Sequence, residues 1–168
     1  MLQVHLDLLS VENNSITIYH GSNSIVEEPE IRISKYTKDF YWGFYCTLIK
    51  EQAEKWAMRN RKDKVVNIYT LSNIKELRCK QFKEMDEEWL EFVVNCRTGG
   101  SHNYEIVEGP MADDTIYNYI NDYIDGIISE AAFWELVKFK YPTHQISFHS
   151  ARALQCLKFE RSYEIYDI

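Results

Sequence analysis

The stretch that decides the fold reads Gly43-Phe44-Tyr45-Cys46-Thr47 and continues through Leu48–Trp56. Its first half favours a short strand, because aromatic and small apolar residues suit a pleated surface. The Thr47 hydroxyl can accept from the first free amides of a helix, so Thr47 is the expected N-cap. The segment after it predicts an amphipathic helix, because apolar residues recur there at helical spacing: Ile49, Ala53, Trp56 and Ala57.

Tyr45 and Trp56 form the first candidate binding feature. Tyr45 leaves the predicted strand beside the helix that carries Trp56, so the two rings could face each other. Two aromatic rings with a gap between them make a slot for a flat heteroaromatic group. Both rings could equally be ordinary core residues, since 14% of the chain is aromatic.

Composition indicates one soluble globular domain. The chain has 168 residues, 45% of them apolar and 27% charged, which is enough for a core without disulfides. The four cysteines show no CxxC spacing, which predicts no metal site and favours a reduced, cytoplasmic setting. No apolar run reaches membrane-spanning length, so no membrane association is expected. Residues 1–15 are interpreted as an N-terminal extension or edge strand, and 16–168 as the domain.

Charge gives a weak indication about nucleic acid. The net charge of −7 argues against an overall electrostatic grip on a phosphate backbone. A basic stretch between Arg59 and Lys64 leaves a local RNA contact open. Cations at a helix end that complement the helix dipole are the simpler interpretation.

The remaining pattern predicts an α+β domain with helices packed on or inserted between the strands of a split sheet. The expected strands are Ile16–His20, Ile31–Ile33, Lys64–Leu71, Leu77–Phe82, Tyr104–Glu108, His144–Phe148 and Lys158–Ile168. The expected helices are Asp86–Cys96, Asp113 or Asp114 to Asp125, Glu130–Phe139 after a Ser129 cap, and a turn over Ala151–Leu157. Lys64–Leu71 is apolar on both faces, which places it inside a sheet.

Three motifs in order resemble the ADP-ribosyltransferase superfamily of the poly(ADP-ribose) polymerase and diphtheria-toxin type. They are Tyr19-His20-Gly21-Ser22, then Gly43-Phe44-Tyr45 with Trp56 downstream, then Gln145-Ile146-Ser147-Phe148-His149. The segment Tyr104–Asp114 resembles a signature of small uncharacterised bacterial members, often encoded beside a small partner protein. The resemblance runs from about Ile16 to Phe159 and implies the split-sheet fold of that superfamily.

The resemblance implies a site for NAD as co-substrate. His20 would hydrogen-bond a ribose hydroxyl, and the backbone of Gly21 would hold the nicotinamide carboxamide, with Ser22 beside it. Tyr45 would stack on one face of the nicotinamide and Trp56 would cover the other, which suits a cationic ring. Many members carry a serine where this chain has Ala53, so one carboxamide hydrogen bond is expected to be missing.

Gln145 stands where many such transferases have a glutamate. That glutamate binds a ribose hydroxyl, and its charge supports the positive character that develops as nicotinamide leaves. Glutamine keeps the hydrogen bonds but lacks the charge and cannot act as a general base. The resemblance therefore assigns catalysis to His20, Tyr45 and Gln145 and favours mono-ADP-ribosylation over chain elongation. A rise in NAD turnover in Gln145→Glu would indicate a competent pocket and an attenuated wild type.

Other charged residues offer alternatives. Four acids gather near a strand end and a Gly-Pro turn, and a catalytic role for one of them is the lesser alternative: Glu105, Glu108, Asp113 and Asp114. Arg97 could reach a phosphate through its forked donors or could be a helix C-terminal cation.

Two functions remain at this point. One is a bacterial mono-ADP-ribosyltransferase, the toxin of a toxin–antitoxin pair with an antitoxin-like partner and an unidentified acceptor. The other is a catalytically weak or inactive module of the same fold that binds NAD, ADP-ribose or a protein. A hydrolase built on Cys46 with His149, or on Ser147 with His20, is set aside because no orienting acid is identifiable.

Overall fold

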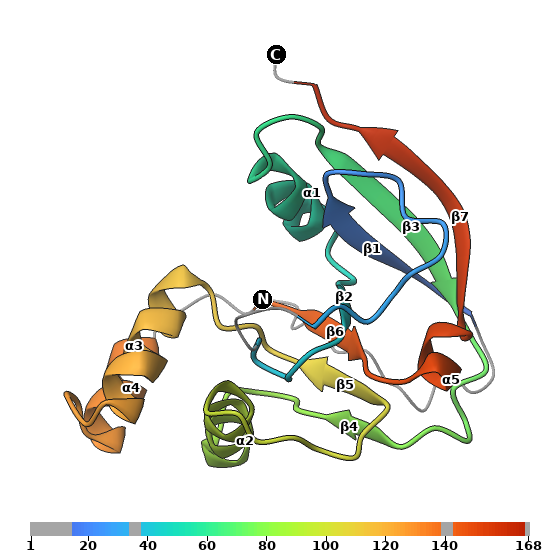
Figure 1. Cartoon of the computed structure of the whole chain (residues 1–168). Helices are drawn as coiled ribbons and strands as arrows, with labels where there is room; N and C mark the ends of the chain where they lie inside the picture. Colours follow the sequence, from blue (N-terminus) through green and yellow to red (C-terminus); the bar gives the residue numbers. More distant parts are fainter. Residues whose placement is uncertain (1–14, 34–37, 139–142, 167–168) are drawn as a thin grey trace.

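The computed structural model describes residues 15–33, 38–138 and 143–166, which form an α+β domain with two sheets and five helices (Figure 1). The α+β class predicted from the sequence is therefore confirmed. The extension or edge strand expected over residues 1–15 lies, except for Ser15, outside the described residues. In the described part of the chain, no helix has the length and apolar character needed to cross a membrane.

The first sheet has three antiparallel strands in the order β1-β3-β7. They are β1 (Ile16–Ser22), β3 (Val65–Leu71) and β7 (Leu157–Glu164). β3 lies in the middle and six of its seven residues are buried, which confirms the expectation drawn from its apolar pattern. Helix α1 (Lys50–Met58) covers one face of this sheet and packs mainly on β1 (Figure 1).

The second sheet has four strands in the order β2-β6-β5-β4. They are β2 (Phe44–Cys46), β6 (Gln145–Phe148), β5 (Ile106–Gly109) and β4 (Cys79–Gln81), and only the β4–β5 pair is parallel. The helices after α1 are α2 (Glu87–Arg97), α3 (Asp114–Ile124), α4 (Glu130–Val137) and α5 (Ala151–Leu154). α3 and α4 pack as a pair to one side of this sheet (Figure 1).

A backbone bridge joins the two sheets. Tyr19 of β1 and Thr47, directly after β2, exchange two hydrogen bonds of 2.8 and 2.9 Å. An apolar cluster fills the space between the sheets, and it includes Ile18, Tyr69, Phe44, Ile146 and Phe148. A second cluster lies between the other face of the four-stranded sheet and helices α2–α4, around Trp89, Val107, Ile116 and Phe133. The split arrangement leaves an opening beside the bridge, where the site described below lies.

Three local predictions need comment. Ile31–Ile33 forms no strand, because its residues run outside both sheets and Arg32 and Ile33 are exposed. α1 begins at Lys50 after Ile49, not directly after Thr47, because the backbone of Thr47 is engaged in the bridge to Tyr19. The Thr47 hydroxyl still accepts from an amide, that of Ile49, at 3.1 Å. The predicted caps Asp113 and Ser129 are confirmed.

Candidate ligand site

A cavity of about 360 Å³ opens where the two sheets and α1 meet. Five of the six residues that the sequence motifs single out line it, although they come from β1, β2, α1 and β6: His20, Gly21, Tyr45, Trp56 and Gln145. The other lining residues are Lys38, Asp39, Arg59, Arg97, Met111, Ala112 and Tyr117. The volume is within the range of about 300–1,000 Å³ typical of small-molecule sites.

The register of β2 on β6 places Tyr45 and Gln145 on one face of the four-stranded sheet. Tyr45 lies directly opposite Ser147, and Gln145 is two residues from Ser147. Because side chains alternate along a strand, Gln145 and Ser147 point to the same side as Tyr45. A shift of one residue would turn both functional side chains into the apolar cluster between the sheets.

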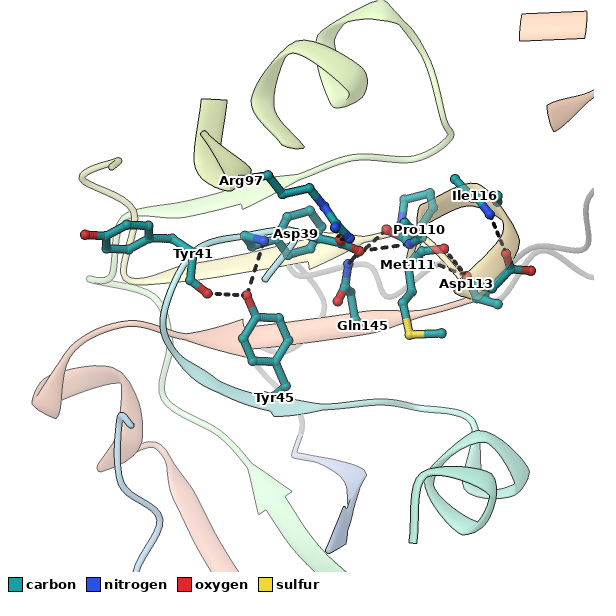
Figure 2. A network of polar contacts seen from close by, with 12 residues as sticks. Asp39, Tyr41, Tyr45, Arg97, Pro110, Met111, Asp113, Ile116 and Gln145 are labelled. Carbon is teal, nitrogen blue, oxygen red and sulfur yellow. Dashed lines mark hydrogen bonds and ion pairs between the residues drawn. The ribbon is translucent and has the colours of Figure 1, made fainter. Parts of the chain in front are cut away.

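Tyr45 is a fixed wall of the cavity. Its side chain is buried, and its hydroxyl donates to Tyr41 O at 2.6 Å and accepts from Phe40 N at 3.2 Å (Figure 2). Burial raises the pKa of the Tyr45 phenol well above its ordinary value. The Nζ of Lys38 lies 4.5 Å from the centroid of the ring. Desolvation lowers the pKa of Lys38.

The geometry of His20 determines which of its nitrogens can meet a ligand. Nδ1 lies 2.6 Å from the carbonyl oxygen of Tyr45, and a carbonyl can only accept, so Nδ1 carries the hydrogen. Burial lowers the pKa of His20 to about 4, and the ring is neutral at pH 7. Nε2 is then a hydrogen-bond acceptor on the wall of the cavity.

Gly21 is required for packing as well as for any ligand contact. A Cβ at this position would lie 2.1 Å from the backbone oxygen of Ala53 and 2.8 Å from the backbone nitrogen of Ala57. The absence of a side chain lets α1 lie directly on β1, and this contact brings half-buried Trp56 to the cavity. Ala53 is fully buried in the α1–β1–β3 contact and is absent from the cavity wall.

Ser22 is the one of these six residues that does not line the larger cavity. Its hydroxyl donates to Ser24 O at 2.5 Å and accepts from Asn67 Nδ2 at 3.1 Å. Ser22 lines a smaller cavity of about 190 Å³, which shares His20, Lys38 and Tyr45 with the first. Ser22 therefore lies outside the wall of the larger cavity, where a Ser22–Ser24 turn holds its hydroxyl, and its predicted role in cofactor binding stays a prediction.

The floor of the cavity is a network around Asp39 (Figure 2). Oδ1 of Asp39 accepts from Nε of Arg97 at 3.0 Å and from Nη2 of the same residue, and the two side chains form a buried ion pair. Oδ2 accepts from Gln145 Nε2 at 2.9 Å and from Ala112 N at 2.8 Å. Gln145 Nε2 also donates to Pro110 O at 3.2 Å. Both carboxylate oxygens are fully used.

The acids suggested by the sequence do not line this cavity. Asp113 caps α3, and exposed Asp114 pairs with Arg59 at 3.2 Å. Glu105 binds Ser150 and the backbone of Arg78, whereas Glu108 binds His144. Among the described residues, the carboxylate on the cavity wall is that of Asp39, which the sequence analysis missed. The sequence feature that could have pointed to Asp39 is its position four residues before Gly43, which begins the second motif.

The cavity has a cationic rim. Lys38, Arg59 and Arg97 line it. Asp39 pairs with Arg97 and Asp114 pairs with Arg59, so one excess positive charge remains, which suits a phosphate-bearing ligand. Arg97 is the last residue of α2, as predicted, but its partner is a carboxylate and not the helix end alone. Arg59 turns toward the cavity, away from exposed Arg61 and Lys62, so the basic stretch is divided.

Neither hydrolase pairing occurs. Cys46 is fully buried in the apolar cluster between the sheets, on the strand face opposite Tyr45, and burial raises the pKa of its thiol. Ser147 contacts His149 at 2.7 Å instead of His20, but Ser147 is fully buried. His149 is oriented by the carbonyl of Trp42 at 2.8 Å and not by an acid. Within the described ranges no cluster of three His, Cys, Asp or Glu side chains could hold a metal ion.

The fold and the site define an α+β domain with a cavity at the junction of its two sheets. The chain belongs to a family of proteins of unknown function, DUF3990, whose model matches residues 16–159. The match covers both sheets up to the middle of β7 and every residue that lines the cavity. No curated protein and no solved structure matches the chain.

Proposed function

We propose that this protein binds NAD in the cavity between its sheets and acts as a mono-ADP-ribosyltransferase with the split-sheet fold of that superfamily. The observation that carries the proposal is the convergence of five motif residues from four elements on one cavity wall. The motifs lie far apart in the sequence, and a chance resemblance gives no reason for their side chains to meet.

The chemistry of the wall matches the parts of NAD. Tyr45 and Trp56 offer aromatic surface for the pyridinium ring, which is drawn to such surface by its charge. His20 Nε2 offers an acceptor for a ribose hydroxyl, since its Nδ1 hydrogen is already committed to the Tyr45 carbonyl. Lys38, Arg59 and Arg97 offer donors for the diphosphate. The cavity of about 190 Å³ adjoins at His20 and Tyr45 and extends the space available to a dinucleotide.

The reaction in this proposal breaks the bond between the ribose C1′ and the nicotinamide nitrogen. The bonding electron pair goes to the ring nitrogen, so nicotinamide leaves neutral and positive charge develops on the ribose. A lone pair of the acceptor then bonds to C1′, and the acceptor gives up its proton to solvent. Gln145 Oε1 places a partial negative charge on the floor of the cavity, beside the Asp39–Arg97 ion pair, where such a transition state is stabilised.

A binding module without chemistry is the second candidate. It is favoured by one observation: the Asp39 carboxylate is paired with Arg97 and fully hydrogen-bonded, so no free general base lies on the described cavity wall. Such a protein would bind NAD or ADP-ribose with the same residues and release both unchanged.

Mass spectrometry of NAD incubated with the pure protein and a cell extract separates these candidates. The transferase releases nicotinamide and adds ADP-ribose to a macromolecule, and His20→Ala or Tyr45→Ala abolishes both. Tyr166→Ala is a matched control, because Tyr166 is 76% exposed and distant from the cavity wall. Binding of NAD without turnover supports the module, and no binding to the wild type contradicts both.

The proposed setting is the bacterial cytoplasm, with the chain as the toxin of a pair and a small antitoxin-like protein as its partner. The segment that resembles the small bacterial members, Tyr104–Asp114, supports this, since its Met111 and Ala112 form part of the cavity wall. Expression of the wild type is expected to slow growth of a bacterial host. Expression of the Tyr45→Ala variant at an equal level is not, and equal toxicity of the two would contradict a role for the cavity.

A further inference from the structure

We propose that Asp39 is the acid of this site and that it positions Gln145, whose amide oxygen it directs into the cavity as a hydrogen-bond acceptor. This inference deepens the proposed function and rests on it for the identity of the ligand. In this arrangement Gln145 donates a hydrogen bond to Asp39, which a glutamate carboxylate at the same position could not do.

The hydrogen-bond network fixes the orientation of the Gln145 amide. Its nitrogen lies 2.9 Å from a carboxylate oxygen of Asp39 and 3.2 Å from the carbonyl oxygen of Pro110. Both neighbours are acceptors, and the amide nitrogen has two hydrogens to offer. The flipped amide would place its oxygen against two other oxygens. Oε1 therefore faces away from them, and among the described residues no group donates to it.

Asp39 is itself held from three directions. Arg97 of α2 donates to Oδ1 from two nitrogens, while Ala112 N and Gln145 donate to Oδ2. The Asp39 and Arg97 side chains are only 5% and 8% exposed, so the pair is shielded from solvent. A buried carboxylate with this many donors is a rigid anchor for the amide.

This geometry predicts the outcome of Gln145→Glu, which the sequence leaves open. A carboxylate at position 145 would replace a donor by an acceptor at 2.9 Å from Asp39 Oδ2 and would face Pro110 O as well. Two carboxylates at this distance do not both ionise near neutral pH, so the new group takes up a proton or is displaced. Gln145→Glu is thus expected to lose function, although glutamate is common at this place in the superfamily that the motifs resemble.

The test is a double-mutant cycle over Asp39→Asn and Gln145→Glu, with Gln145→Met as an uncharged control that removes both amide groups. Melting temperature and the NAD dissociation constant are measured at pH 7.5. Each single substitution is expected to lower Tm by about 5–10 °C and to weaken NAD binding about tenfold or more. The double variant keeps the net charge and restores a donor–acceptor pair between positions 39 and 145, so it is expected to recover part of both losses. Ala112 N and Pro110 O would each still face a group of their own kind, which limits the recovery.

A pH series supplies a readout that a general packing defect does not move. The charged and titratable groups that face position 145 across the cavity are His20, Lys38, Asp39, Tyr45, Arg59, Arg97 and Tyr117. As pH falls, more of the new carboxyl is protonated, and its single O–H can donate to Asp39 in place of one amide hydrogen. Gln145→Glu should therefore approach the wild type as pH falls, and Gln145→Met should not.

Three results would overturn the inference. The first is that Gln145→Glu alone binds NAD or turns it over as well as the wild type. The second is that the losses in Tm and NAD affinity of the double variant equal the sum of the losses of the two single variants. The third is that Gln145→Glu and Gln145→Met have parallel pH profiles. If the wild type does not bind NAD, the proposed function fails instead. The melting cycle then still decides whether Asp39 holds Gln145, because that readout needs no ligand.

Discussion

The ammonium group of Lys38 lies 4.5 Å from the centroid of the Tyr45 ring, so a cation already occupies one face of the aromatic wall of the cavity. This contact has two opposing consequences for NAD. The ammonium competes with the pyridinium for the ring face, and at the same time it contributes positive charge for the diphosphate.

Lys38→Ala should separate the two effects. Loss of the competing cation is expected to strengthen binding of N-methylnicotinamide, a cation without phosphate, by roughly 2- to 5-fold. Loss of a positive charge is expected to weaken binding of ADP-ribose by about the same factor. Calorimetric titration of both probes measures the split, with Lys62→Ala as the exposed control outside the cavity. If Lys38→Ala changes the affinity for both probes in the same direction and by the same factor, Lys38 does not have two opposing effects. It then acts only through the stability of the protein or only through its positive charge.

Gly21→Ala should disrupt the contact between α1 and β1. The new methyl group would meet backbone atoms of Ala53 and Ala57, which cannot turn aside as a side chain can. We expect a loss of about 3 kcal/mol in the free energy of unfolding, measured by urea denaturation, together with a shift in tryptophan fluorescence as Trp56 moves.

Gly99→Ala is the matched control for that substitution. Gly99 has φ +96°, and no atom lies within 4 Å of an added Cβ, so its cost is backbone strain alone, about 1–2 kcal/mol. A smaller loss for Gly21→Ala than for Gly99→Ala would mean that the helix moves off the strand at little cost.

The parts of the fold that the sequence predicted are those with local signals. The apolar run at Lys64–Leu71 and the caps at Asp113 and Ser129 each depend on residues within one element, and each prediction is confirmed. Ile31–Ile33 shows the limit of such signals. Two isoleucines alternate there as in a strand, but a strand needs a neighbour, and neither sheet offers one at that point.

Part of the site was predictable from the order of the motifs and not from local signals. Motif order led to His20, Tyr45 and Gln145, and strand periodicity accounts for Tyr45 and Gln145 sharing a face. Asp39 escaped because it lies outside any helix or strand, and its partners Arg97, Ala112 and Gln145 are 58, 73 and 106 residues away. No periodicity connects such positions. The same holds for Ser22, whose partner Asn67 lies 45 residues on.

Stability is expected to fall as the solution is acidified from pH 6.5 to pH 4, in part because of two histidines. Burial lowers the pKa of both His20 and His149 to about 4, from 6.5 in the unfolded chain. Between pH 6.5 and pH 4 the unfolded chain binds more protons than the folded chain. The contribution of these histidines to the free energy of unfolding is therefore fully present above pH 6.5 and is lost as pH falls toward 4. Each histidine contributes up to about 1.4 kcal/mol per pH unit.

His149→Gln isolates one of these contributions, because a glutamine can donate to the Trp42 carbonyl as the imidazole does. Urea denaturation of the wild type and the variant at pH 8 and pH 5 gives the comparison. The wild type should lose more stability than the variant between the two conditions. A variant with an unchanged pH slope would show that His149 titrates normally in the folded protein.

Two buried glutamates near β5 have opposite surroundings, although they are only three residues apart. Glu105 accepts from Ser150 and from the backbone amide of Arg78, and it lies 3.7–3.8 Å from the guanidinium groups of Arg78 and Arg152. Glu108 has one partner among the described residues, His144 at 3.0 Å, and its Oε2 is buried without any. Because Leu48 N donates to His144 Nδ1, the hydrogen of the imidazole is on Nε2 and supplies that single bond.

The same substitution at both positions should therefore have different effects. Glu105→Gln removes the charge that two arginines face and turns one acceptor into a donor, and we expect it to cost about 2–3 kcal/mol of unfolding free energy. Glu108→Gln keeps the acceptor for His144 and removes a carboxylate oxygen that is desolvated without compensation. Its effect is expected to lie within about 1 kcal/mol of zero, because an unpaired amide is cheaper to bury than an unpaired charge. Urea denaturation at pH 7 compares the two variants directly. A cost at Glu108 equal to that at Glu105 would mean that the second oxygen has a partner in the folded protein, and Glu108 would then belong with the structural acids of this domain.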